Sequence, residues 1–224
     1  MKCKSKYLES DKLTKTGTLY KILKSREIIV DEERTKDRVI IEYIVQNGQY
    51  GICCSEYKPP FIDDEGAKKV DVLVLVIDEK NKKFSSWILD MKQSVGGEDV
   101  IFHLLEQLQD SLKHKNALAI YMDDFREEQH LGFVTRDLQI ERIEESVKKR
   151  EKELNDIKKS TLQMFPIIRN KGMIESIKLK KEIETLSMFL DKKMKIKDQI
   201  YPIESYISEK QGEYFVYNLQ VQCG

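Results

Sequence analysis

The sequence predicts a mixed α/β fold in which helices flank a central sheet. Two runs rich in Val, Leu and Ile surround a polar turn at residues 70–92, which is typical of buried strands. Apolar residues at helical spacing follow over 98–115, and a heptad pattern begins near residue 138. Of the 224 residues, 40% are hydrophobic, enough for a core, and 35% are charged, which indicates long exposed helices. We therefore expect one large domain with an appendage.

The first 60 residues predict one hairpin. Asn47-Gly48 lies between two β-rich runs, and this dipeptide favours the positive φ angles of a tight turn. We expect strands at about 38–46 and 49–57. Leu19, Ile22 and Leu23 indicate a short helix before them.

The stretch from Lys69 to Ser94 predicts a second hairpin. Residues 70–77 and 84–92 are its strands, and residues 79–83, without an apolar side chain, are the turn. Asp90 and Lys92 are two positions apart, so in a strand they project from the same face. Asp71 opens the partner strand. The three polar groups are therefore expected to converge at one end of the hairpin.

These three groups suit metal-assisted hydrolysis of a phosphodiester. Two carboxylates supply the hard oxygen ligands that Mg²⁺ prefers, and Mn²⁺ is the alternative ion. The ion polarises a phosphoryl oxygen and activates water. A lysine two residues on is suited to orient the attacking water or stabilise charge on the phosphate.

Asp71, then eighteen intervening residues, then Asp90-Met91-Lys92 resembles the PD-(D/E)xK nuclease signature of the restriction-endonuclease-like fold. Val70 stands where the signature has proline. The resemblance implies that Asp71 and Asp90 bind Mg²⁺ or Mn²⁺ and that Lys92 assists the nucleophile. It also implies that the hairpin is followed by a helix and another strand, within a mixed central sheet flanked by helices.

Other polar residues are rivals or additions to this site. Asp78 is a second candidate for the first ligand, ranked lower because it lies near the turn. Glu42 and Glu56 are candidate upstream acids, although exposed strand carboxylates are the commoner case. Some relatives within the superfamily place a glutamine on the following helix near the metal, so the resemblance makes Gln107 a candidate, with His103 behind it. An exposed polar stripe is the alternative for both.

The rest of the chain extends the sheet and adds helices. We expect a helix at about 98–115 and strands at 116–122 and 131–135. Ile140, Ile143, Val147, Leu154, Ile157, Thr161 and Met164 fit heptads, with Arg150 as the exception. Pro166 ends this run, and a second helix is expected at about 172–197, with an apolar side made by Ile174, Ile177, Ile183, Leu186, Phe189 and Leu190. Residues 200–221 predict a final hairpin with its turn at 209–212.

The expected organisation is a nuclease-like core over residues 1–136, an antiparallel helical hairpin arm over 137–198, and a C-terminal β-hairpin over 199–224 that packs on the core. The arm, residues 138–197, is the expected contact for a second copy of the chain or for a partner protein. Its lysines are interleaved with acids, which favours a solvated face.

Composition excludes several classes of protein. The formal net charge is zero, which argues against a DNA-coating protein, although a nuclease needs only a local basic surface. The four cysteines form no CxxC pair or Cys/His cluster, so no structural zinc is expected. No signal peptide or long apolar run is seen, so we expect a reduced cytoplasmic protein that does not enter a membrane.

Two functions follow. The first is a Mg²⁺-dependent endonuclease acting on DNA; the motif does not distinguish DNA from RNA. Small nucleases of this superfamily often serve bacterial defence against foreign DNA, which is the context that the resemblance implies. The second is a non-catalytic interaction subunit that binds a partner protein through the helical arm.

Overall fold

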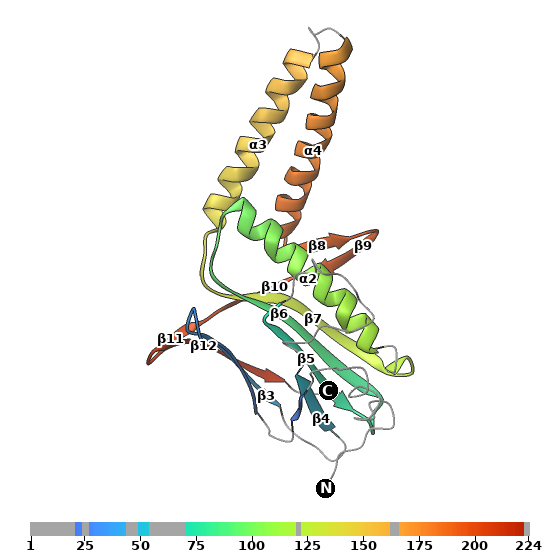
Figure 1. Cartoon of the computed structure of the whole chain (residues 1–224), viewed down its shortest axis with the longest axis vertical. Coiled ribbons are helices and arrows are strands. Elements are labelled where there is room, and N and C mark those ends of the chain that lie inside the picture. Colours follow the sequence, from blue (N-terminus) through green and yellow to red (C-terminus); the bar gives the residue numbers. More distant parts are fainter. Residues whose placement is uncertain are drawn as a thin grey trace. The chain divides into compact units, whose positions relative to one another are not determined.

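The computed structural model describes residues 21–23, 27–43, 49–53, 70–119, 122–161 and 166–221 (Figure 1). The chain forms two compact units. The first comprises residues 1–93, 104–136 and 204–224, and the second comprises residues 94–103 and 137–203. The architecture is mixed α/β, as predicted, with helices and several sheets.

The first unit is built around a sheet in the order β1-β4-β5-β6-β7-β10. Its strands are β1 (Lys21–Leu23), β4 (Gln49–Cys53), β5 (Val72–Asp78), β6 (Lys83–Val95), β7 (Arg126–Leu138) and β10 (Glu204–Ile207). The first four strands pair antiparallel, and β10 pairs parallel with β7. Strands β6 and β7 run in the same direction, because Lys82 accepts a backbone hydrogen bond from Arg126 at one end and Val95 accepts one from Gln139 at the other.

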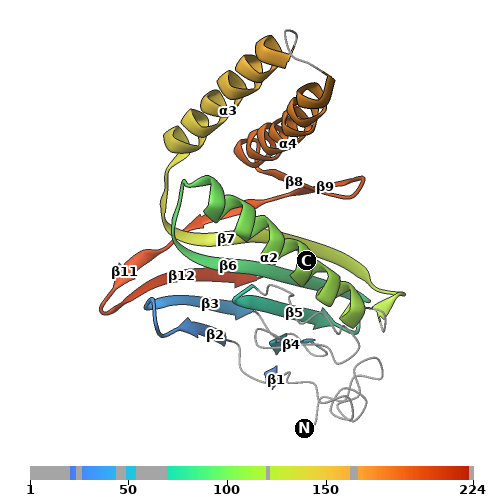
Figure 2. The same cartoon turned by 45° about the horizontal axis from the view of Figure 1, so that its top comes forward.

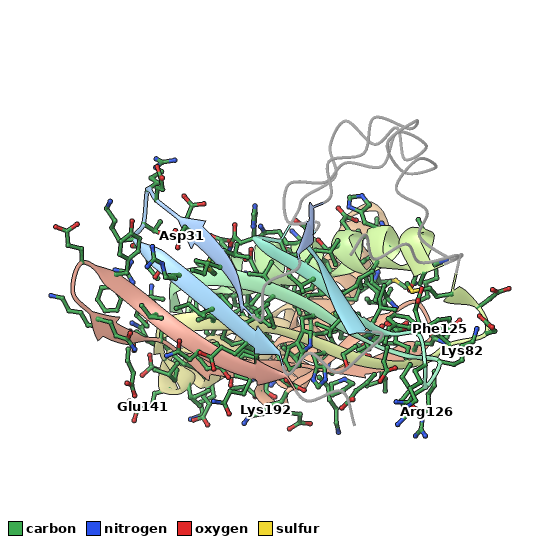
Figure 3. All side chains as sticks on the ribbon, turned by 90° about the horizontal axis from the view of Figure 1, so that it is seen from below. Asp31, Lys82, Phe125, Arg126, Glu141 and Lys192 are labelled. Atoms are coloured by element: carbon green, nitrogen blue, oxygen red, sulfur yellow. The ribbon has the colours of Figure 1, made fainter. Side chains whose placement is uncertain are left out.

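Strands β5 and β6 are the predicted hairpin, joined by a turn at residues 79–82. Every residue of β5 is buried, as its near-continuous apolar run predicts. Lys82 holds the turn: its Nζ lies 2.7 Å from Asp124 Oδ2 and 4.8 Å from the centre of the Phe125 ring. Figure 3 shows Lys82, Phe125 and Arg126 together at this end of the sheet.

A second sheet of the same unit has the order β11-β12-β3-β2. Its strands are β2 (Glu27–Glu32), β3 (Asp37–Tyr43), β11 (Glu209–Gln211) and β12 (Tyr214–Val221). Val39, Ile41 and Leu219 from this sheet share a buried cluster with Val74, Trp87 and Leu89 of the six-stranded sheet, so the two sheets pack face to face (Figure 2). Arg136 of β7 also binds the buried Asp37 of β3, with Nε and Oδ1 2.9 Å apart.

Helix α2 (Glu98–Ala119) covers the opposite face of the six-stranded sheet (Figures 1 and 2). Its buried apolar residues are Ile101, Leu104, Leu108 and Leu112, which recur at the spacing of one helical face. Alternation in β6 sends Ser86, Ile88 and Asp90 toward this helix, while Trp87, Leu89 and Met91 join the cluster between the sheets. The site therefore lies on the α2 side of the hairpin.

The second unit contains α3 (Ile140–Thr161), α4 (Pro166–Leu190) and a hairpin of β8 (Lys193–Ile196) and β9 (Gln199–Pro202). Helices α3 and α4 pack against each other and run in opposite directions. Arg150, the exception in the heptads, lies on the inner side of α3 and pairs with Glu98 Oε2 at 2.6 Å and Glu182 Oε2 at 3.0 Å. A charged residue is tolerated there because acids of α2 and α4 face it.

Several predicted elements are wrong. The strand at 116–122 is wrong because α2 continues to Ala119, and β7 begins at Arg126 instead of 131. The strands on either side of Asn47-Gly48 exist, but β3 and β4 belong to different sheets and do not pair. Lys21–Leu23 is a strand instead of part of a helix. Asn and Gly permit a turn without specifying that the flanking strands pair.

The C-terminal half also differs from the prediction. Pro166 is the first residue of α4, where proline is well tolerated because the first N–H groups of a helix have no intrahelical partner. The helix ends at Leu190, and residues of its expected C-terminal part form β8. The final hairpin joins β11 to β12 with Gly212 at a φ of 63°, while β10 pairs with β7. In the described ranges, no helix is long and apolar enough to cross a membrane.

Candidate active site

Asp90 is the centre of the candidate site. It lies near the end of the long strand β6, and alternation directs it toward α2. The residue is 0% exposed. Its Oδ1 accepts a hydrogen bond from Gln107 Nε2 at 3.2 Å, and its Oδ2 forms an ion pair with Lys92 Nζ. This oxygen is buried, and the Lys92 ammonium offsets part of the cost of removing it from water.

Asp71 lies just before β5, beside the end of the partner strand. Its Oδ2 accepts a hydrogen bond from the backbone N–H of Met91 at 2.7 Å. Met91 is the residue between Asp90 and Lys92, so this contact joins the start of β5 directly to the motif on β6. Extending the paired register of the hairpin places Asp71 opposite Asp90.

Lys92 and Gln107 complete the group. Lys92 Nζ donates to Gln107 Oε1 at 3.0 Å, while the amide of Gln107 donates to Asp90. The Lys92 side chain is 21% exposed, so it borders solvent while it pairs with a fully buried acid. The structure thus brings together Asp71, Asp90, Lys92 and Gln107.

The two carboxylates perturb one another. Burial, followed by the charge of Asp71, raises the pKa of Asp90 from 3.8 to about 7, against the opposing effect of Lys92. Near neutral pH the pair therefore holds less than two full negative charges, and a cation between the carboxylates would offset their repulsion.

The donor set fits Mg²⁺ or Mn²⁺. Asp71 and Asp90 offer carboxylate oxygens, and one buried oxygen of Asp90 lacks a hydrogen bond. Among the residues that the structure describes, no group of three or more His, Cys, Asp or Glu side chains is arranged around a metal position. Mg²⁺ is commonly held by one or two carboxylates, with water and substrate oxygens as its other ligands.

The other candidates lie elsewhere. Asp78 is buried at the far end of β5, where its two oxygens accept from the N–H and side-chain amide of Asn81, so it stabilises the turn. Glu42 is exposed on β3, in the other sheet, and His103 is exposed on α2. Glu56 lies outside the described residues.

Apart from Gln107, which is a candidate from the sequence, one polar feature of α2 escaped the sequence interpretation. Gln107, Ser111, His114 and Lys115 recur at helical spacing and are all buried against the sheet. Lys115 Nζ contacts both oxygens of Glu127 at 2.6 and 2.7 Å, and Ser86 Oγ donates to the same acid at 2.6 Å. The spacing was visible in the sequence, but polar residues on one helix face normally indicate solvent.

Comparison of the chain with models of protein families, with curated proteins and with solved structures finds no match.

Proposed function

We propose that this protein is a Mg²⁺-dependent endonuclease that hydrolyses phosphodiester bonds of DNA. The observation that carries the proposal is the convergence of Asp71, Asp90 and Lys92 at one end of a single hairpin. The order of elements supports it, since the β5–β6 hairpin is followed by α2 and then by β7. This order is the one that the resemblance to PD-(D/E)xK nucleases implies.

Asp71 and Asp90 are the residues that would hold the ion. The chemistry that Mg²⁺ supplies when bound is polarisation of the phosphoryl oxygen and an increased acidity of the attacking water. Asp90 is kept in position by Gln107 on one oxygen and by Lys92 on the other. Asp71 is fixed by the N–H of Met91, so the two carboxylates are oriented before a ligand arrives.

Lys92 is the group suited to the attacking water and to the phosphate. Its Nζ is held by Asp90 and Gln107, yet part of the side chain reaches solvent. The reaction joins the water oxygen to phosphorus and breaks one P–O ester bond. It leaves a phosphomonoester on one strand end and an alkoxide on the other; the attacking water loses a proton, and the alkoxide takes one up to become a hydroxyl. A fixed ammonium stabilises the negative charge that grows on the phosphate.

Nicking of a supercoiled plasmid tests this function. We expect the wild type to cleave with Mg²⁺ or Mn²⁺ and Lys92→Ala to lose at least about a hundredfold in rate, the typical contribution of one charge-stabilising group. Lys113→Ala is the matched control, because Lys113 is exposed and pairs with Asp110, one turn away on α2. Equal rates for Lys92→Ala and wild type would refute the assignment. Cleavage of RNA in place of DNA would redirect the substrate class.

A second candidate is a non-catalytic subunit that binds a partner protein through the α3–α4 pair. The observation that favours it is a group of exposed apolar side chains on α4, namely Met173 (54% exposed), Ile174 (70%) and Ile177 (62%). Apolar residues gathered on a helix surface are typical of protein contacts.

A further inference from the structure

Helix α2 holds both halves of the candidate site with two residues one turn apart. Gln107 binds Asp90 and Lys92 on β6, as described above. Ser111, four residues further on, is 2% exposed and faces the same sheet. Its contact is with the other side of the site, at the start of β5.

Ser111 Oγ accepts a hydrogen bond from the backbone N–H of Val70 at 3.0 Å. Val70 is buried and lies outside the paired register of β5. A buried N–H without an acceptor is unfavourable, so this hydroxyl satisfies a group that the strand ladder does not reach. Because Val70 immediately precedes Asp71, the bond fixes the main chain at the residue that carries the first carboxylate.

Asp71 is therefore held from two directions. Ser111 fixes the main chain just before it, and the N–H of Met91 fixes its side chain. We infer that Ser111 is a positioning residue for the metal-binding pair: together with Gln107 it sets the placement of Asp71 relative to Asp90. The inference rests on the proposed function, because it names a residue that supports the same site.

Removal of the hydroxyl should act on metal affinity. Ser111→Ala leaves the Val70 N–H buried without its acceptor, so the main chain before Asp71 must shift or admit water. Loss of a residue that orients a metal ligand without touching the metal typically changes metal affinity by about 10–100-fold. We expect a loss within that range, with cleavage recovered at high Mn²⁺, because the carboxylates themselves remain.

The experiment measures binding of Mn²⁺ alone to the full chain by isothermal titration calorimetry. The variants are Ser111→Ala, Ser111→Thr, which keeps the acceptor, and Ser86→Ala as the matched control. Ser86 is also fully buried and its hydroxyl also makes one hydrogen bond, but its partner is Glu127. We expect Ser111→Ala to weaken binding, Ser86→Ala to bind as the wild type does, and Ser111→Thr to bind more tightly than Ser111→Ala. Circular dichroism and urea unfolding establish that each variant is folded at the assay temperature.

The outcomes separate this inference from the proposed function. Wild-type Mn²⁺ affinity in folded Ser111→Ala overturns the role of Ser111 and leaves the nuclease proposal intact. Equal losses in Ser111→Ala and Ser86→Ala also overturn it, because they indicate general destabilisation. If folded wild-type protein binds no Mn²⁺, both the proposed function and this inference fail. The comparison between the two alanine variants decides the matter even if Ser111→Thr does not fold.

Discussion

The carboxyl of Asp90 has an environment far from that of an ordinary surface acid, because the residue is fully buried. Its desolvation is offset in part by Lys92 and by the amide of Gln107. A neighbouring carboxylate, Asp71, works in the opposite direction. Such a pair is stabilised either by a shared proton or by a bound cation. The stability of the site therefore depends on both pH and metal concentration.

The stability of the metal-free protein should therefore fall as pH rises. The pKa of Asp90 is about 7 in the folded protein and 3.8 ordinarily. The folded state thus retains a proton that the unfolded chain has lost, and the resulting stabilisation, fully present below pH 3.8, disappears as pH rises to about 7. The change is on the order of a few kcal/mol.

Urea unfolding in the presence of EDTA measures this effect at pH 5 and pH 8. Asp90→Asn, which cannot ionise, should remove most of the difference between the two pH values. A wild type whose unfolding free energy is equal at both pH values, or greater at pH 8, would contradict the assignment. Addition of Mn²⁺ at pH 8 should restore stability to the wild type and not to Asp90→Asn.

The close approach of strands β7 and β10 requires a residue without a side chain at one position of β7. In β7, a Cβ built on Gly132 would lie 2.1 Å from the backbone oxygen of Glu204 in β10. The backbone of β10 cannot move away without loss of its hydrogen bonds to β7. Only glycine therefore permits this pairing, and the sheet edge depends on it.

Gly132→Ala should destabilise the protein by about 1–3 kcal/mol or more, the usual cost of forcing atoms into a packed position. Gly97→Ala is the control, because its Cβ would meet the nearest atom, Val100 Cγ2, at an ordinary distance of 4.0 Å. The measurement is the urea midpoint of both variants. Equal midpoints would show that β7 and β10 are not in the contact described.

The α3–α4 pair depends on Arg150. Its guanidinium reaches Glu98 at the start of α2 and Glu182 on α4. Arg150→Ala should cost about 2 kcal/mol, because half-buried Glu98 loses a charged hydrogen-bond partner and half-buried Glu182 loses an ion-pair partner. Arg142→Ala, at an exposed position with one weak contact to Gln139 at 3.3 Å, should be nearly neutral. Thermal unfolding followed by circular dichroism at 222 nm compares the two, and similar midpoints would contradict a role for Arg150.

At the scale of the whole molecule, the two proposed functions differ in whether the protein acts alone or in a complex with another protein. The zero net charge provides no general attraction to nucleic acid, so a nuclease function relies on local contacts. The exposed apolar group of Met173, Ile174 and Ile177 instead favours protein association. The two proposed functions therefore place the active surface on different elements.

Ile174→Glu distinguishes association from independent action. If the α4 group holds a second copy, sedimentation velocity should show an oligomer for the wild type and a monomer for the variant, because a charge in an apolar contact is strongly unfavourable. Glu175→Lys, a charge reversal at an exposed position that helical spacing places away from the apolar group, should leave the oligomer in place. A wild type that is monomeric at all concentrations tested would argue against self-association through α4.

Local periodicity accounts for what was predictable. The strand character of 72–78 and 83–95, the helix beginning at Glu98, and the common face of Asp90 and Lys92 all follow from neighbouring residues. The residue at which α2 ends was harder to predict from the sequence, because the segment Asn116 to Ala119 is compatible with a buried strand or a helix. The length of α2 and its packing on the sheet decided in favour of the helix.

Strand partners were not predictable, because pairing depends on residues far apart in the chain. Glu42 belongs to β3, and β3 pairs with β12, whose residues lie nearly 180 positions later in the numbering. The dipeptide Asn47-Gly48 carries no information about that distant strand. The division of the N-terminal strands between two sheets was therefore settled by burial of Val39 and Ile41 against β5 and β6.

The amino-acid order alone determined the chemistry available: two acids and a lysine at the end of one hairpin, spaced so that alternation directs Asp90 and Lys92 to one side. Only the folded chain decided which groups surround them. It placed Gln107 between Asp90 and Lys92, set Ser111 behind Asp71, and removed Asp90 from water so that its pKa rises. The reason is physical: side-chain direction is set by local backbone geometry, whereas burial and partners are set by the packing of distant elements.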